Sequence, residues 1–425
     1  MKRRVVISGL GVISAIGNGK DAFWRGLLAG ASGETPLSEV TCCSLFQHHS
    51  FDAQVVCEVK DFAPLAHNVP ADCLDMDRSI QFALAGAHQA MQDARLEELD
   101  DCERAGVVLA TAICGTQTLD KEFTKVTGMG SHPIRSAGVS PHLYAAAMGN
   151  SAALIIASRY GFQGETVTLS TGCIGGVDAI SYAYESIACG DHDIMITGAA
   201  EAPITPITIA AFDIIHCLSH HHSQASRPFC SSRDGFVLSE GCGIVVLEEL
   251  EHALARQAPI YAEVTGWSVT EHAVHMTDMS PEGRDLVRAI TETMDRAGIL
   301  PSQVDFINAH GTSTPQNDIR ETQAIKAALG PRASMIPVNS TKSMLGHSLA
   351  AASAIEVVAC TLSLQHQMLH PTVHHLDPDP ACDLDYVPNT PRSYSMQQLI
   401  TTASGFSGLH AALAMRSVTD DGRTQ

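Results

Sequence analysis

Short runs of β-branched residues alternate along this chain with longer alanine-rich stretches that have the apolar spacing of helices. Strands are predicted over Val5–Ser8, Gly106–Ala110, Thr166–Ser170, Asp193–Thr197, Val304–Asn308, Met335–Asn339 and Gln398–Thr402. Helices are predicted over Ser79–Ala94, Val177–Ala188, Gly283–Ala297 and Asp318–Leu329. Strands separated by helices predict βαβ units in a mostly parallel sheet, and therefore an α/β fold.

A weak internal repeat divides the chain into two related parts. Thr166–Cys173 has the pattern of a strand that ends in Ser-Thr before a helix, and Met335–Ser343 has the same form. Each is followed by a helix, a strand and a turn of small residues. We expect one half at residues 1–258, a second at 259–417, and a polar tail at 418–425.

Composition excludes several classes of protein. Hydrophobic residues make up 45% of the 425 residues and charged residues 17%, which is typical of a well-buried enzyme. A formal net charge of −20 disfavours a nucleic-acid binder. The 13 cysteines are odd in number and include no Cys-x-x-Cys pair, so we expect a reducing cytoplasm. No apolar run reaches the roughly 20 residues of a membrane span, so no membrane association is expected.

Cys173 lies where a predicted strand ends and a helix begins. Unsatisfied backbone N–H groups and the positive end of the helix dipole favour a thiolate there, which predicts a nucleophile. Gly172, Gly175 and Gly176 keep the surroundings small. A buried structural cysteine is the commoner reason for a cysteine in a tight turn, so the prediction depends on partners elsewhere in the chain.

Two histidines supply such partners. His310 follows a predicted strand directly, and His347 follows a glycine five residues after Lys342. Parallel α/β sheets gather their chemistry at the carboxyl ends of strands, so both should lie near Cys173. Two neutral imidazoles can donate N–H bonds to an oxygen that becomes negative. Lys342 can fix their protonation states, and Glu321 is an available counter-ion for it.

The segments around Cys173, His310 and Lys342–His347 resemble the Cys-His-His signature of β-ketoacyl synthases, which are condensing enzymes of the thiolase-fold superfamily. Ser404–Gly408 is similar to the family's Gly-Phe-Gly-Gly loop, with Ser407 in place of a glycine. The resemblance covers Val5 to Met415. Further segments are most similar to ketosynthase-alpha subunits of type II aromatic polyketide synthases: Ala200–Ile207, Ala225–Phe229, Arg233–Gly241, His275–Thr277 and Cys382–Pro388.

The resemblance implies a thiolase-like fold, in which two duplicated βαβ halves form α-β-α-β-α layers. It also implies a decarboxylative Claisen condensation of malonyl-acyl carrier protein with an acyl or polyketide chain bound to Cys173. In this scheme His310 and His347 stabilise the enolate oxygen. Lys342, paired with Glu321, holds the histidine network.

Other site residues are implied in the same way. The backbone N–H groups of Cys173 and Phe406 would form the oxyanion hole, and Phe406 would also gate access to the cysteine. Thr312, Thr314 and Thr277 would bind the pantetheine arm of the carrier. No metal and no organic cofactor are expected, because the arm of the carrier brings the activated carbon.

The implied partners are an acyl carrier protein and a chain-length-factor-like subunit that lacks the active cysteine. Association through the strand after the nucleophile helix, about Asp193–Thr197, is expected. A fatty-acid elongation synthase that acts as a homodimer is the alternative. Coenzyme A-dependent relatives fit less well, because chalcone-type enzymes have asparagine where His347 stands and thiolases have a second cysteine. A non-catalytic subunit would not retain the whole set of catalytic residues.

Two other groups of residues suggest a metal site and a charge network. Cys217 and His220–His222 suggest a metal site, but consecutive histidines point in different directions in any regular structure, so zinc is not expected. Arg227, Arg233 and Asp234 are expected to form a buried charge network that shapes the fold.

Overall fold

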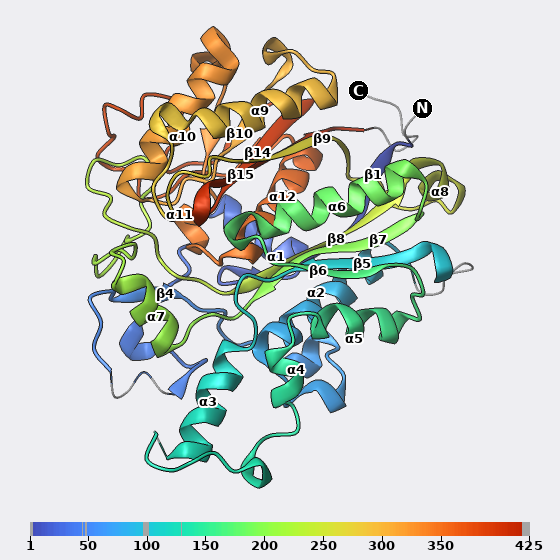
Figure 1. Ribbon diagram of the computed structural model, residues 1–425. Coiled ribbons are helices and arrows are strands. Elements are labelled where there is room, and N and C mark those ends of the chain that lie inside the picture. The colour runs from blue at the N-terminus through green and yellow to red at the C-terminus, as the bar shows by residue number, and fades with distance from the viewer. Residues whose placement is uncertain (1–2, 45, 47–48, 97–101, 129, 419–425) are drawn as a thin grey trace.

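The structure is a computed structural model that describes residues 3–44, 46, 49–96, 102–128 and 130–418 (Figure 1). All but the first residue of the predicted polar tail, 418–425, lies outside the described residues. The strands are β1 Val5–Ser14, β2 Gly17–Asn18, β3 Glu34–Pro36, β4 Val55–Cys57, β5 Ala105–Ala110, β6 Thr166–Leu169, β7 Ile194–Glu201, β8 Gly241–Glu249, β9 Ala262–Glu271, β10 Phe306–Asn308, β11 Val338–Asn339, β12 Met368–Leu369, β13 Arg392–Ser393, β14 Gln398–Ser404 and β15 Leu409–Arg416. The α-helices are α1 Lys20–Leu28, α2 Arg78–Asp93, α3 Thr116–Thr127, α4 Leu143–Ala147, α5 Ser151–Tyr160, α6 Gly175–Cys189, α7 Pro206–Asp213, α8 Leu250–Ala255, α9 Arg284–Ala297, α10 Pro315–Leu329, α11 Lys342–Leu345 and α12 Ala350–His366.

The same strand order occurs twice in the main sheet. One set runs β6-β5-β7-β8-β1 and the other β11-β10-β14-β15-β9, so that each strand has a counterpart in the other half. The two sets join where β1 pairs antiparallel with β9. The repeat predicted from Thr166–Cys173 and Met335–Ser343 thus corresponds to β6 and β11, which occupy equivalent positions. The exact boundary at residues 258 and 259 stays a prediction.

The expectation of a mostly parallel sheet is wrong for one strand of each half. β5 pairs parallel with β6 and β7, but β8 runs antiparallel to both β7 and β1. In the second half β15 is likewise antiparallel to β14 and β9. In the second half a short turn explains the antiparallel pairing. Only Gly405–Gly408 separates β14 from β15, and so short a turn reverses the direction of the chain.

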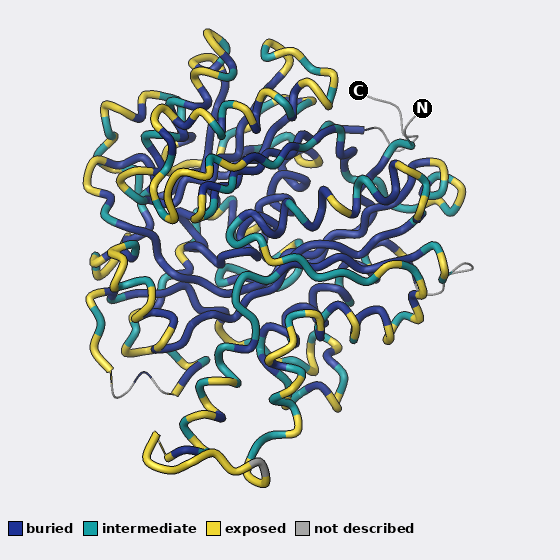
Figure 2. The backbone as a smooth tube through the Cα atoms, viewed as in Figure 1, coloured by how far each residue is buried: buried dark blue, intermediate teal, exposed yellow. Residues whose placement is uncertain are grey.

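Helices α6 and α12 form a central layer between the two sets of strands (Figure 1). Helices α2 and α5 cover one outer face, and α9 and α10 cover the other. This confirms the predicted α-β-α-β-α layering. The central helices touch closely: a Cβ atom at Gly176 would lie 2.4 Å from the backbone nitrogen of Ala354. The buried core follows these layers, as the tube in Figure 2 shows.

The two ends of the sheet differ. β6 ends the sheet on one side, and all four of its residues are partly exposed. β11 ends the other side of the sheet and is buried under later segments of the chain. These segments bond to it: Val338 donates its N–H to the carbonyl of Asp385 at 2.7 Å, and the Asn339 side chain donates to the carbonyl of His370 at 2.8 Å. β7 lies in the interior between β5 and β8, so the expected association through Asp193–Thr197 is wrong.

All 13 cysteines lie within the described residues, and no disulfide joins any two of them. No helix in the described part of the chain is long and apolar enough to cross a membrane.

Candidate active site

Cys173 lies just after β6, on a 3₁₀ turn over Gly172–Ile174 that leads into α6. Gly172 has φ of 59°, in the left-handed region that glycine adopts without strain. The fully buried Ile174 anchors the turn in the core. The predicted nucleophile thus lies at the junction between a strand and a helix.

The resting state of the Cys173 thiol differs from the prediction. Burial raises the pKa of the thiol to about 11, although the charge of Lys342 and the backbone N–H groups of Cys173 and Phe406 act in the opposite direction. The helix N-terminus alone was expected to favour a thiolate, but loss of water around the sulfur outweighs it. The two N–H groups that face the sulfur come from the residues expected to form the oxyanion hole.

His310 and His347 meet at the same place from the second half of the chain. His310 follows β10, and His347 lies between α11 and α12. Their ring centroids are 5.2 Å apart, with the planes at 88°. Burial lowers the pKa of both imidazoles well below the usual value, and the charge of Lys342 lowers it further. Both rings are therefore neutral at physiological pH and able to donate one N–H each.

The predicted ion pair between Lys342 and Glu321 is wrong. The Lys342 ammonium lies 2.5 Å from Glu356 on α12, and both side chains are almost fully buried. Glu321 instead accepts the backbone N–H of His310 at 2.7 Å and that of Gly311 at 2.8 Å, with a further bond from the Thr402 hydroxyl. Glu321 therefore fixes the backbone that carries His310, and Glu356 neutralises the lysine.

A cavity of about 270 Å³ brings most of the predicted site together. Its walls include Cys173, His310, His347, Phe406, Thr277, Thr312 and Thr314. Lys342 and Glu321 do not line it but lie behind its walls. Glu356 was not predicted as a site residue, although it is the one carboxylate in a largely apolar helix and a buried carboxylate needs a partner.

An aromatic wall of the cavity was also not predicted. Phe212 on α7 lies 5.3 Å from Phe236 and 6.5 Å from Phe406, measured between ring centroids. Phe236 in turn packs edge-on against the ring of His347 at 5.3 Å. No motif marks Phe212 in the sequence, because its role arises from the way α7 folds over the cavity.

The loop with Phe406 differs from the glycine-rich pattern of the family at one position. Ser407 has φ of 67°, a left-handed conformation that glycine adopts more easily than serine. Its N–H donates to the carbonyl of Met276 at 2.5 Å, so this loop is joined to the segment that carries Thr277. Phe406 itself is 38% exposed, at the mouth of the cavity.

The structure also describes the histidine run His220–His222 and the charged residues Arg227, Arg233 and Asp234. Within the described residues no group of three or more His, Cys, Asp or Glu could hold a metal ion, and the His221 ring lies 3.0 Å from the Ser232 carbonyl instead. Arg227, Arg233 and Asp234 do not bond to one another, so the expected network is wrong. Arg233 pairs with Asp379 and Asp318, whereas Asp234 accepts from Ser219 and from the backbone N–H of His220.

Comparisons with known proteins agree with this geometry. The family "Beta-ketoacyl synthase, N-terminal domain" matches residues 2–253, and "Beta-ketoacyl synthase, C-terminal domain" matches residues 261–376. A putative polyketide beta-ketoacyl synthase 1 of Streptomyces halstedii is 42% identical over 98% of each chain. A solved structure is titled "AntDE:AntF (apo): type II PKS acyl-carrier protein in complex with its ketosynthase bound to the hexaketide". One chain of it is 40% identical to this protein, with a TM-score of 0.91 over 99% of this chain and 100% of that one. The ishigamide ketosynthase/chain length factor structure is 34% identical, with a TM-score of 0.88 over the same shares.

Proposed function

The chain belongs to the β-ketoacyl synthase family, and we propose that it is the catalytic ketosynthase of a type II polyketide synthase. Its reaction is a decarboxylative Claisen condensation of malonyl-acyl carrier protein with a chain held on Cys173. The observation that carries this proposal is the single cavity in which a thiol faces two buried, neutral imidazoles.

Loading of the chain is a thioester exchange at Cys173. The sulfur attacks the carbonyl of the incoming acyl-carrier, and the Cys173 proton leaves with the released pantetheine thiol. Because the pKa of the thiol is raised to about 11, few free sites hold a thiolate, and the proton must move as the new bond forms. The N–H groups of Cys173 and Phe406 stabilise the oxyanion of the tetrahedral intermediate.

Condensation uses the histidines of the second half. Loss of carbon dioxide from malonyl-carrier leaves an enolate, whose oxygen accepts N–H bonds from His310 and His347. The enolate carbon then attacks the Cys173 thioester, and the cysteine sulfur leaves and takes up one proton. Neutral imidazoles suit this role, since they donate to a developing negative charge without first losing a proton to the carboxylate.

The buried charges behind the cavity keep the histidines in this state. The positive Lys342 disfavours a second positive charge on either ring, and Glu356 offsets the lysine so that the site is not strongly charged. Glu321 fixes the backbone of His310. Thr312, Thr314 and Thr277 line the cavity, and in this proposal their hydroxyls bind the pantetheine arm. The scheme needs no resident metal or organic cofactor.

The partners proposed are an acyl carrier protein and a chain-length-factor-like ketosynthase subunit. Relatives at 40% and 34% identity form complexes of these two kinds. Within the described residues no strand pairs with the outer edge of β6, so a second subunit can add a strand there, whereas the β11 edge is covered by the protein itself. A cytoplasmic location belongs to the same proposal.

The test is reconstitution of the enzyme with its partner subunit and a carrier protein, with malonyl-carrier as substrate. Intact mass of the carrier should show unreduced poly-β-keto chains, and only when both subunits are present. Elongation of a saturated acyl-carrier by this chain alone, as a homodimer, would instead assign it to fatty-acid elongation. No consumption of malonyl-carrier under either condition would contradict both functions.

A further inference from the structure

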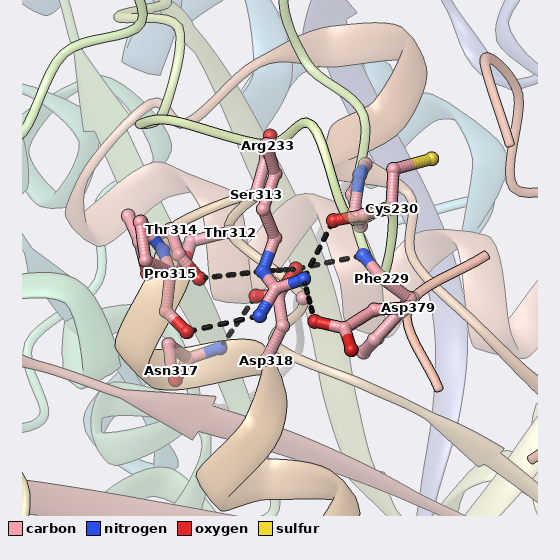
Figure 3. Close-up of polar contacts among 12 residues, drawn as sticks. Phe229, Cys230, Arg233, Thr312, Ser313, Thr314, Pro315, Asn317, Asp318 and Asp379 are labelled. Carbon is pink, nitrogen blue, oxygen red and sulfur yellow. Dashed lines mark hydrogen bonds and ion pairs between the residues drawn. The ribbon is translucent and has the colours of Figure 1, made fainter. Parts of the chain in front are cut away.

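Arg233 is buried next to the cavity, with its side chain only 3% exposed. Its Nε atom donates to the carbonyl of Thr314 at 3.0 Å, and one terminal nitrogen donates to the carbonyl of Pro315 at 2.9 Å (Figure 3). Two of its three nitrogens thus bind consecutive carbonyls where a loop meets the start of α10. That loop carries Thr312 and Thr314 in the wall of the cavity.

The other contacts of Arg233 hold the guanidinium from the opposite side. Its remaining terminal nitrogen donates to the Asp379 carboxylate and to the Cys230 carbonyl, both at 2.6 Å. The Asp318 carboxylate lies 3.6 Å from Nε and accepts the backbone N–H of Phe229. Because the guanidinium is planar and rigid, these contacts together fix where the loop carbonyls can lie.

The loop needs such support. Ser313 between the two threonines has φ of 67°, in the left-handed region that is unfavourable for serine. The hydroxyls of Thr312 and Thr314 are 2.9 Å apart and bond to each other. A small rotation of the loop would therefore move both hydroxyls in the wall of the cavity at the same time.

We propose that Arg233 is a positioning residue for the phosphopantetheine arm of the carrier. By holding the carbonyls of Thr314 and Pro315, it sets the direction of the threonine hydroxyls that bind the arm. The inference rests on the proposed function and extends it beyond residues that contact the substrate. Since the arm is bound alike in the ground state and the transition state, loss of this support raises KM and leaves kcat nearly unchanged.

The main variant is Arg233→Lys, which keeps the positive charge but loses the planar fork. Its matched control is Arg227→Lys, because the Arg227 side chain binds the carbonyls of Gln224 and Ser223 and the Ser232 hydroxyl but not the threonine loop. Both are compared with the wild type in the complete complex with the partner subunit. The readouts are KM and kcat for malonyl-carrier, and the rate at which iodoacetamide alkylates Cys173.

For Arg233→Lys we expect KM to rise roughly tenfold with kcat within about twofold of wild type. Alkylation of Cys173 should keep its rate, because iodoacetamide has no pantetheine arm. Arg227→Lys should match the wild type throughout. An Arg233→Lys enzyme with the KM of Arg227→Lys, or one in which kcat and alkylation fall together, would overturn the inference.

A second variant, Asp379→Asn, decides the matter if Arg233→Lys does not fold. It keeps Arg233 and removes the negative charge of its ion pair on the side away from the threonine loop, while the remaining side-chain oxygen can still accept the N–H of Ala381. A rise in KM of roughly threefold at unchanged kcat is expected, and an unchanged KM would overturn the inference. Failure of the wild-type complex to consume malonyl-carrier would contradict the proposed function itself, and that result is distinguishable because the wild type is measured first.

Discussion

The third strand of each half, β6 and β11, ends at the same cavity but delivers different chemistry there. After β6 comes a half-buried thiol with no ion pair, and after β11 come a fully buried lysine and a histidine. Each is followed by a long helix of the central layer, α6 or α12. In the proposed mechanism the duplicated scaffold separates the two tasks of one reaction: one copy would hold the chain, and the other would prepare the attacking carbon.

The largest effect is expected from removal of the Cys173 thiol, which follows β6. Cys173→Ala should abolish covalent loading, since the proposed mechanism holds the acyl chain on this sulfur, and condensation should fall by roughly 10⁴-fold or more. Intact mass of the enzyme after incubation with acyl-carrier measures the loading. The control is Cys217→Ala, a second thiol in the wall of the same cavity, which should still load. Loading of Cys173→Ala would show that another residue is the nucleophile.

The next largest effect concerns the charge after β11, which has no equivalent after β6. Lys342→Met leaves Glu356 buried without its partner and should lower the free energy of unfolding by about 3–5 kcal/mol. The double variant Lys342→Met/Glu356→Gln should recover much of that loss, because no unpaired charge remains. Urea unfolding of the three proteins measures this. Equal stability of the single and double variants would mean that the ion pair does not hold this junction.

The contact between α6 and α12 should give an effect of intermediate size. A methyl group at Gly176 would lie 2.4 Å from the Ala354 nitrogen, so Gly176→Ala must push the two central helices apart. We expect a loss of about 3 kcal/mol of unfolding free energy. The matched control is Gly161→Ala, because nothing lies within 4 Å of the added group there; its φ of 69° should still cause a small loss. Equal losses in the two variants would contradict close contact in the central layer.

The smallest effect concerns the segment that covers β11 and has no counterpart at β6. Burial lowers the pKa of His370 in this segment to about 4. The unfolded chain therefore binds a proton that the folded protein does not between pH 6.5 and 4, and stability falls as the pH falls through this window. At pH 5 this amounts to about 2 kcal/mol relative to pH 8. His370→Gln should flatten that part of the pH–stability curve, and an unchanged slope would contradict burial of the ring.

The sequence predicted the reacting residues better than their supports. Cys173 and His310 follow the ends of strands and His347 follows a glycine, so the local sequence pattern singled them out. Lys342 pairs with Glu356 rather than Glu321 because the packing of α12 decides which carboxylate reaches it. The antiparallel strands β8 and β15 lack a preceding crossover helix of the predicted kind, so the βαβ pattern did not reveal them.

The roles of Phe212 and of the contacts between Arg233 and the threonine loop could not be predicted from the sequence either. Their roles depend on contacts between segments far apart in the chain, such as the one between Arg233 and Asp379. No spacing along the sequence encodes such contacts. The resemblance to a family supplied the roles of the site residues, whereas the geometry supplied the reasons why those residues can perform them.

In the proposed mechanism the two halves of the chain perform separable half-reactions, and measuring both half-reactions in two variants tests this directly. Release of ¹⁴CO₂ from malonyl-carrier reports the second half, and acyl loading of the enzyme reports the first. We expect His310→Ala to load an acyl chain normally but to lose decarboxylation by roughly a thousandfold, and Cys173→Ala to decarboxylate but not to load. If each variant lost both activities to the same extent, the division of labour between the two halves would be contradicted.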